Sequence, residues 1–152
     1  MNQWEPIGVV HSPRKSLDDD HWGDVVSTIK LSPGIPTESL SGLETFSHVE
    51  VIFLFDRYEA DAAVEWSRHP RGDKRFPVVG VFAQRVSKRP NRIGATVVKV
   101  EKVSGDTLTV RGLDAADGTA VLDIKPVFRE FLPRESVEQP TWVSELMRDY
   151  WR

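Results

Sequence analysis

The sequence predicts an all-β protein: a single small β-barrel of short antiparallel or mixed strands with few short helices, one of them at the C-terminus. Three observations predict it. Short apolar stretches recur along the chain, turn residues separate them, and little of the chain has helical periodicity. Many short strands with proline and glycine between them are typical of a barrel or sandwich. At 152 residues the chain fits one domain, 1–152, with its own core.

The first expected strands are residues 7–10 and 25–31, and the second alternates apolar and polar residues as a half-buried strand does. Residues 49–55 and 78–83 are nearly continuous apolar runs. Such runs predict central strands that are buried on both faces.

The next two expected strands, 96–103 and 107–110, flank Ser104-Gly105-Asp106, which is a hairpin signal. A last short strand, 121–124, precedes Pro126. These elements together make six or seven short strands with turns between them.

Two helical segments are expected. Residues 37–40 predict a single turn, and residues 142–151 predict a short amphipathic helix at the C-terminus. Thr141 is the expected N-cap of the second, and Trp142, Leu146 and Tyr150 share one face of it.

The composition narrows the classes of protein. The formal net charge is −3 and cysteine is absent, so any RNA contact has to come from a local basic patch and no disulfide scaffold exists. The four histidines lack the spacing of metal ligands, which predicts no metal site. No run approaches the ~18 apolar residues of a membrane span, and the start of the sequence lacks the basic end and apolar stretch expected of a signal peptide. These features predict a cytoplasmic protein with no membrane partner.

Residues 80–94 form the most informative motif. A strand runs into Arg85, a loop follows at Arg89-Pro90-Asn91, and Gly94 admits the next strand. Three arginines are more than a turn needs, and the alternative is a turn with solvated charges. The basic residues before and within this motif form a candidate patch: Arg68, His69, Arg71, Lys74, Arg75, Lys88, Arg89 and Arg92.

Residues 112–126 form a second motif. Asp117-Gly118 predicts a hairpin turn. Asp114, Asp123 and Lys125 stand in apolar surroundings, where charges are usually paired. Asp123 and Lys125 are expected to form such a pair, and for each charge a structural role and a site role remain open.

One histidine and one run of aspartates have interpretations that need no ligand. His48 precedes an apolar strand and is expected to be a structural histidine. Residues 18–20 are three consecutive aspartates, which predict an exposed loop because three adjacent carboxylates cannot all face one ion.

Four segments, taken in order, resemble the tRNA threonylcarbamoyladenosine N6-methyltransferase family. They are residues 7–13, 42–48, 80–94 and 114–126, and the resemblance extends over about residues 6–133. It implies an S-adenosylmethionine-dependent methyltransferase on a small β-barrel, with tRNA as the methyl acceptor. It also implies a homodimer with the cofactor near the subunit interface.

The resemblance further implies the site residues. Carboxylates such as Asp56 or Asp114 would hold the amino group or ribose of the cofactor, and Arg85 would clamp its carboxylate. No catalytic base is assigned, because positioning of donor and acceptor supplies much of the rate. The implied cofactor-binding residues are His21, Trp22, Gly23, Asp56, Arg57, Arg85, Ala95, Thr96, Gly112, Leu113, Asp114 and Ala115, and the expected RNA contacts are Arg71, Arg89, Asn91 and Arg92.

Departures from the family pattern keep two alternatives open. An acidic and aromatic loop, 18–23, replaces a basic one, and Asp56 stands where the family usually has histidine. A carboxylate- and aromatic-lined pocket suits a small cationic or heteroaromatic acceptor, which favours a small-molecule methyltransferase. A non-catalytic sensor that binds the cofactor or a nucleotide is the third hypothesis.

Overall fold

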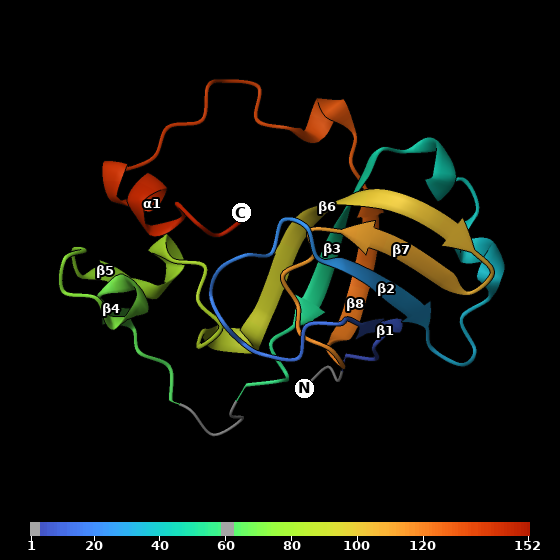
Figure 1. The fold of residues 1–152 in the computed structure, drawn as a ribbon, viewed down its shortest axis with the longest axis horizontal. Coiled ribbons are helices and arrows are strands. Elements are labelled where there is room, and N and C mark those ends of the chain that lie inside the picture. The colour runs from blue at the N-terminus through green and yellow to red at the C-terminus, as the bar shows by residue number, and fades with distance from the viewer. Residues whose placement is uncertain (1–3, 59–62) are drawn as a thin grey trace.

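The computed structural model describes residues 4–58 and 63–152, and most of its strands close into one antiparallel barrel (Figure 1). The barrel strands are β1 (Gly8–His11), β2 (Val26–Leu31), β3 (His48–Leu54), β6 (Ile93–Ser104), β7 (Thr107–Arg111) and β8 (Ala120–Pro126). Their order around the barrel is β1-β2-β7-β6-β3-β8. The predicted all-β barrel is confirmed.

Alternation along each strand places one face inside the barrel. In β3, Val49, Val51 and Phe53 are buried, whereas the residues between them are partly exposed. The prediction that this strand is buried on both faces is therefore wrong, because a closed barrel has one interior and no second layer covers it there. The core also takes residues from the other strands and the loop after β7: Val10, Ile29, Val98, Leu108, Val110, Leu113, Ala115 and Val121.

Strand β6 joins the two halves of the barrel, since it pairs with β3 at one end and with β7 at the other. Gly94 lies near its start, where an added Cβ would sit 2.6 Å from the Phe53 ring, so only glycine lets that ring pack against the strand. The predicted hairpin between β6 and β7 is confirmed, and Gly105 at its turn has φ +59°.

A small lobe stands beside the barrel and contains a two-stranded sheet of β4 (Ser67–Arg68) and β5 (Val79–Gly80). The predicted strand 78–83 is thus mostly wrong, because the chain turns into a 3₁₀ helix at Val81–Ala83. The buried Gln84 side chain holds that turn by donating to the carbonyl oxygens of Arg68 and Val79, at 3.2 and 3.0 Å. Phe82 is left exposed.

The helices are short. The 3₁₀ helices are η1 (Thr37–Leu40), η2 (Leu43–Thr45), η3 (Pro70–Gly72), η4 (Val81–Ala83), η5 (Pro90–Arg92) and η6 (Arg129–Phe131), and the α-helix is α1 (Thr141–Leu146). The expected turn at 37–40 and the C-terminal helix are both confirmed in kind.

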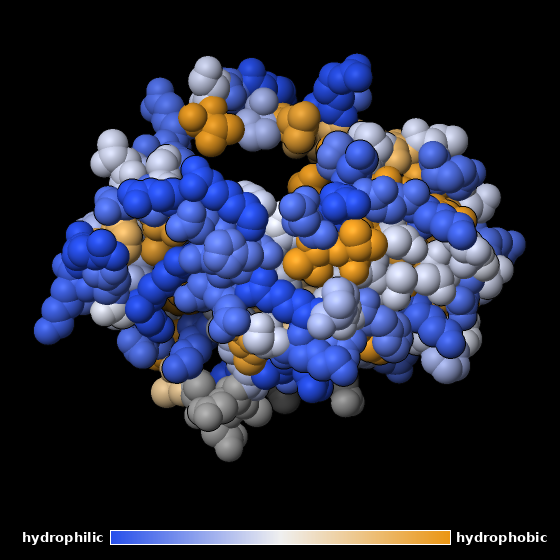
Figure 2. All heavy atoms as spheres, viewed as in Figure 1, coloured by the Kyte–Doolittle hydropathy of each residue, from blue (hydrophilic) through white to orange (hydrophobic). Residues whose placement is uncertain are grey.

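The C-terminal helix differs in detail from the prediction. Pro140, not Thr141, is its N-cap, and Tyr150 lies beyond its last residue. After β8 the chain arches away from the barrel, and its end turns back toward the barrel (Figure 1). Between these two parts, α1 packs on the lobe through Trp142 and Phe76, whose ring centroids are 6.4 Å apart. Figure 2 shows a hollow beneath this arch. The helix ends at Leu146, and Asp149, Tyr150 and Arg152 bond to the loop before β2.

Candidate functional site

Asp114 is the centre of a polar cluster at one end of the barrel. Its neighbours Leu113 and Ala115 are buried in the core, so they anchor the loop after β7 while the Asp114 side chain remains partly exposed. One carboxylate oxygen accepts a hydrogen bond from the Thr96 hydroxyl at 2.5 Å, and the other accepts one from the Tyr150 hydroxyl. Strand β6, this loop and the C-terminal segment therefore meet at one carboxylate.

Gly112 directs the chain across the barrel end. Its φ of +87° lies in the left-handed region, which favours glycine. Its amide donates to the Val25 carbonyl at 2.9 Å and so ties the loop to the start of β2.

Two tyrosines lie close to Asp114. Burial raises the pKa of Tyr58, and the charges of Asp19 and Asp114 raise it further. Burial and then the charge and hydrogen bond of Asp114 raise the pKa of Tyr150 far above its usual value, while the Arg85 charge opposes them. Both phenols are therefore protonated at neutral pH and can donate to an anionic or carbonyl acceptor.

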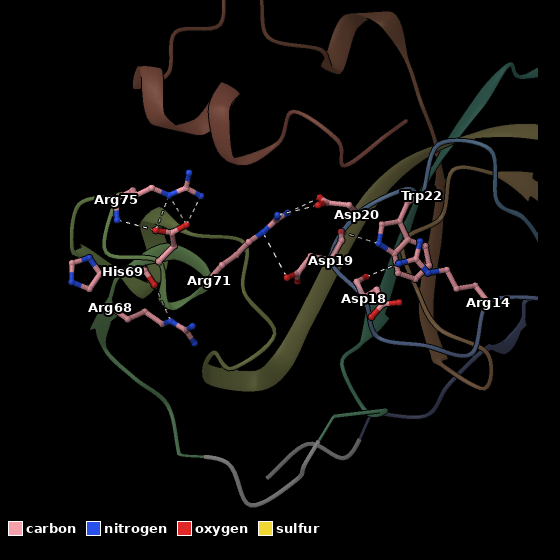
Figure 3. Close-up of polar contacts among 10 residues, drawn as sticks. Arg14, Asp18, Asp19, Asp20, Trp22, Arg68, His69, Arg71 and Arg75 are labelled. Atoms are coloured by element: carbon pink, nitrogen blue, oxygen red, sulfur yellow. Dashed lines mark hydrogen bonds and ion pairs between the residues drawn. The ribbon is translucent and has the colours of Figure 1, made fainter.

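The loop before β2 forms one wall of the cluster. The Arg14 guanidinium stacks over the Trp22 ring at 3.7 Å and donates to the carbonyl oxygens of Asp18 and His21, at 2.8 and 3.0 Å (Figure 3). Trp22 is 3% exposed, and its indole N–H donates to the Asp19 carbonyl. The loop is thus a folded unit held by arginine–aromatic stacking.

A cavity of about 10 Å³ lies between this loop and the barrel end. Its lining residues come from the loop, the end of β3 and the segment after β7: Leu17, Trp22, Phe53, Leu54, Phe55, Arg57, Tyr58, Asp114, Ala115, Ala116 and Thr119. Aromatic walls around one carboxylate are the arrangement that a ligand with a cationic or heteroaromatic group would require.

Of the predicted cofactor residues, only Trp22, Arg57, Asp114 and Ala115 line this cavity, and the others make different contacts. Arg85 donates to the Ala95 carbonyl at 2.5 Å, and Ala95 is adjacent to Thr96. Asp56 accepts from the Ala120 amide at 3.3 Å and so fixes the start of β8. Gly23 and His21 contact the C-terminal segment.

Two residues at the site, Tyr58 and Tyr150, were not predicted from the sequence. Tyr58 directly follows Asp56 and Arg57, so its position next to the predicted segment was a usable signal. Tyr150 gave no such signal, because its spacing assigned it to a helix face and only the tertiary structure brings it to Asp114.

The four residues predicted to contact RNA have different environments in the structure. Arg71 is paired with Asp20 at 2.9 Å and with Asp19 at 3.8 Å, which links the lobe to the acidic loop (Figure 3). Arg89 donates to the Gln84 carbonyl at 2.7 Å. Asn91 and Arg92 have φ of +62° and +49°, so the loop is tightly turned there.

The other motif residues make contacts away from Asp114. Asp123 and Lys125 form the predicted pair at 3.1 Å, on exposed side chains. Asp117 and Gly118 form a turn, but the expected hairpin is wrong because β7 and β8 are not neighbours in the barrel. Asp117 instead accepts from the Ser12 amide at 2.9 Å. His48 is exposed, and its ring bonds to the adjacent Ser47 hydroxyl.

Within residues 4–58 and 63–152, no group of three or more histidine, cysteine, aspartate or glutamate side chains is arranged to hold a metal ion. In the same described part of the chain, no helix has the length and apolar character needed to cross a bilayer.

Known proteins are similar to this chain in sequence and in fold. The tRNA-methyltransferase O N-terminal domain matches residues 11–131. A probable S-adenosyl-L-methionine-binding protein of Pyrococcus abyssi is 37% identical over 140 residues, which cover 88% of this chain and 72% of the relative. A human tRNA (adenine(37)-N6)-methyltransferase is 41% identical over 107 residues, 69% of this chain but 23% of the relative.

The crystal structure of TrmO from Pseudomonas aeruginosa superposes with a TM-score of 0.71 at 30% identity, covering 90% of this chain and 61% of that one. The chain thus spans under a quarter of the human relative and about three fifths of the solved structure. Because the family match extends over most of the chain, the protein belongs to the tRNA-methyltransferase O N-terminal domain family.

Proposed function

We propose that the protein is an S-adenosylmethionine-dependent methyltransferase that acts on N6 of a modified adenosine of tRNA, of the threonylcarbamoyladenosine kind. One observation carries the proposal. Within the region of the family match, the start of β6, the end of β3 and the loop after β7 meet around Asp114. Relatives named as S-adenosylmethionine-binding proteins and tRNA methyltransferases support it.

The chemistry of these residues fits the cofactor. Asp114 would hold its ammonium group or ribose hydroxyls, and Arg85 would hold its carboxylate. Trp22 and Tyr58 would face its heteroaromatic ring or sulfonium, to which aromatic faces are attracted. When bound, the cofactor supplies a methyl group on a good leaving group, and the residues of this chain contribute by orienting donor and acceptor.

The acceptor assignment rests on the loop 85–92. Arg89, Asn91 and Arg92 lie on the segment that follows Arg85, so an RNA bound there would approach the cofactor. A small-molecule acceptor is the second candidate, and a specific observation favours it: the acidic loop pairs with Arg71 and removes that charge from the basic patch.

We also propose an oligomeric state and a cellular location for the protein. Residues 1–152 act as one S-adenosylmethionine-binding domain in the cytoplasm, and two copies form a homodimer. An exposed aromatic cluster supports the dimer: Phe128 stacks on Phe46 at 5.8 Å and lies 6.0 Å from Phe131, which is 85% exposed. Light scattering on the purified protein tests this, and a dimer that persists in Phe131→Glu would contradict this surface.

The test of function is calorimetric binding of S-adenosylmethionine to wild type and to Asp114→Asn. Removal of the carboxylate charge should weaken binding by roughly 10- to 100-fold, the usual contribution of a charge-assisted hydrogen bond. Asp123→Asn is the matched control, because Asp123 lies on the exposed pair with Lys125. Equal affinity in all three proteins would contradict the proposed site.

The acceptor is tested by methyl transfer to tRNA at two salt concentrations. A tRNA acceptor predicts that transfer falls steeply with salt, since phosphate contacts release counterions. Salt-independent transfer to a small acceptor would favour the second candidate, and cofactor binding without any transfer would favour a sensor.

A further inference from the structure

The last four residues of the chain lie across the candidate site. The amides of His21 and Trp22 donate to the carbonyl oxygens of Asp149 and Tyr150, at 3.0 and 2.8 Å. The His21 ring bonds to the Arg152 carbonyl oxygen at 3.0 Å. With the Tyr150 hydroxyl on Asp114, the segment is held at both the loop and the carboxylate.

Two residues of the loop, His21 and Gly23, have the geometry that this contact requires. A Cβ added at Gly23 would lie 1.9 Å from the Trp151 carbonyl oxygen, a distance at which the backbones must separate. His21 has φ +70°, which turns its amide and ring toward the segment. The loop therefore has the local geometry that docking of residues 149–152 requires.

The site has little room while the Tyr150 hydroxyl is bonded to Asp114. The cavity beside Asp114 has a volume of about 10 Å³, whereas pockets that hold ligands of cofactor size measure roughly 300–1,000 Å³. Several of its other walls are anchored in the barrel core, since Phe53 and Ala115 belong to that core. The loop residues of the wall, Leu17 and Trp22, are not part of that core, and residues 149–152 dock on this loop.

The chain that leads to this segment can release it. Residues 131–141 are exposed throughout, and they form part of the arch in Figure 1. Trp151 is 48% exposed even when the segment is docked. Release would break the four hydrogen bonds described above and would leave the barrel ladder intact.

We propose that residues 149–152 are a gate over the site: the Tyr150 hydroxyl occupies the Asp114 carboxylate, and S-adenosylmethionine binds only when the segment is released. The proposal rests on the proposed function, because it assigns Asp114 to the cofactor. The apparent association constant then equals the intrinsic association constant multiplied by the fraction of molecules whose gate is open. Weakening the docked state therefore tightens binding.

The experiment compares S-adenosylmethionine binding by wild type and by the Tyr150→Phe variant of the same 152-residue chain. Phenylalanine keeps the ring but cannot donate to Asp114, so the dissociation constant should fall by roughly tenfold, in line with loss of a hydrogen bond to a charged group from the closed state. Val137→Ala, in the exposed arch, is the control and should bind as wild type does. Unchanged or weaker binding by Tyr150→Phe, with binding by wild type intact, overturns the gate and leaves the proposed function standing.

A second readout does not depend on affinity. Hydrogen exchange at the His21 and Trp22 amides should be slow in the protein alone and fast at saturating S-adenosylmethionine. Gly23→Ala should make both amides exchange quickly without any ligand, because the added Cβ displaces Trp151. Amides that stay protected in the complex overturn the gate. Absence of binding by every variant overturns the proposed function, and the gate with it.

Discussion

Two basic segments, 68–75 and 85–92, look alike in the sequence and differ in the structure. In the first, Arg71 pairs with Asp20 at 2.9 Å and Arg75 pairs with Asp73 at 2.6 Å. In the second, Arg85 and Arg89 donate to main-chain carbonyl oxygens of Ala95 and Gln84. A carbonyl orients a guanidinium but cancels no charge, whereas a carboxylate does both.

A count of basic residues therefore does not measure the charge that a segment offers to a ligand. The acidic loop 18–20 supplies the counter-charges of Arg71, and it is far from that arginine in the sequence. The pair of Arg75 is local, two residues away. Segment 85–92 is therefore the stronger candidate for contact with phosphate or carboxylate.

Of the measurements that compare the two segments, cofactor binding should change most. Arg85→Ala should weaken S-adenosylmethionine binding by roughly 30-fold or more, because loss of one partner from a close charge pair costs about 2–5 kcal/mol. Arg75→Ala should leave binding unchanged, since Asp73 already holds that side chain. Calorimetric titration of both variants checks the contrast.

The same two variants should differ only slightly in their free energy of unfolding. Arg85→Ala loses one hydrogen bond from an exposed side chain to Ala95, a change of about 0.5–1.5 kcal/mol. The midpoint of thermal unfolding should fall by about 1–6 °C. Equal cofactor binding by Arg85→Ala and wild type would remove Arg85 from the site and end the contrast between the segments.

A smaller effect is expected on tRNA binding. Arg89→Ala should lower affinity by roughly three- to tenfold and reduce the slope of log affinity against log salt by about 0.7–0.9, the amount for one phosphate contact. Arg71→Ala should change the slope less, because its charge is already paired with Asp20. Filter binding of tRNA across a salt series measures both, and equal slopes for the two variants would contradict the distinction.

The barrel was predictable because its signals are local. Alternation at residues 25–31 and the Gly105 turn depend on neighbours in the sequence, and both were confirmed. The prediction for residues 78–83 was mostly wrong because apolar character does not specify a strand, and a partner strand lies alongside residues 79 and 80 alone. The segment's side chains instead divide between a buried Val81 and an exposed Phe82.

The site was predictable only in part. Asp114 and Thr96 lie on segments of the family resemblance, and the structure brings them within hydrogen-bonding distance. The contacts of Tyr150 with Asp114 and of Arg71 with Asp20 join residues far apart in the chain. Sequence periodicity carries no information on such contacts, since it describes one element at a time.

The charges near the site also predict how its tyrosines titrate. Burial and Asp114 raise the pKa of Tyr150, and Arg85 opposes them. The near-ultraviolet absorbance of tyrosinate should therefore rise only above pH 10, the ordinary value, and Tyr150→Phe should remove the later of two steps. A group whose folded pKa is raised stabilises the fold below its unfolded pKa, so docking of the C-terminal segment should weaken as pH rises above 10. Titration of Tyr150 at its ordinary pKa would contradict its burial against Asp114.

The smallest effect concerns the local pair of the first segment. Hydrogen bonds from Arg75 lower the pKa of Asp73 to about 2 from 3.8. A carboxylate with a depressed pKa stabilises the fold above its unfolded pKa, and that contribution is lost as pH falls from about 4 to about 2. Because the pair lies in solvent, the effect on unfolding should be close to the limit of detection.

Carbon-detected NMR of Asp73 is the sharper measurement of this pair. In wild type the carboxyl should titrate near pH 2, and in Arg75→Ala it should return toward 3.8. If Asp73 instead titrated at its ordinary pKa in wild type, Arg75 would be free of its partner in solution. The charge of segment 68–75 would then be available to a ligand, and the distinction between the two basic segments would rest on Arg71 alone.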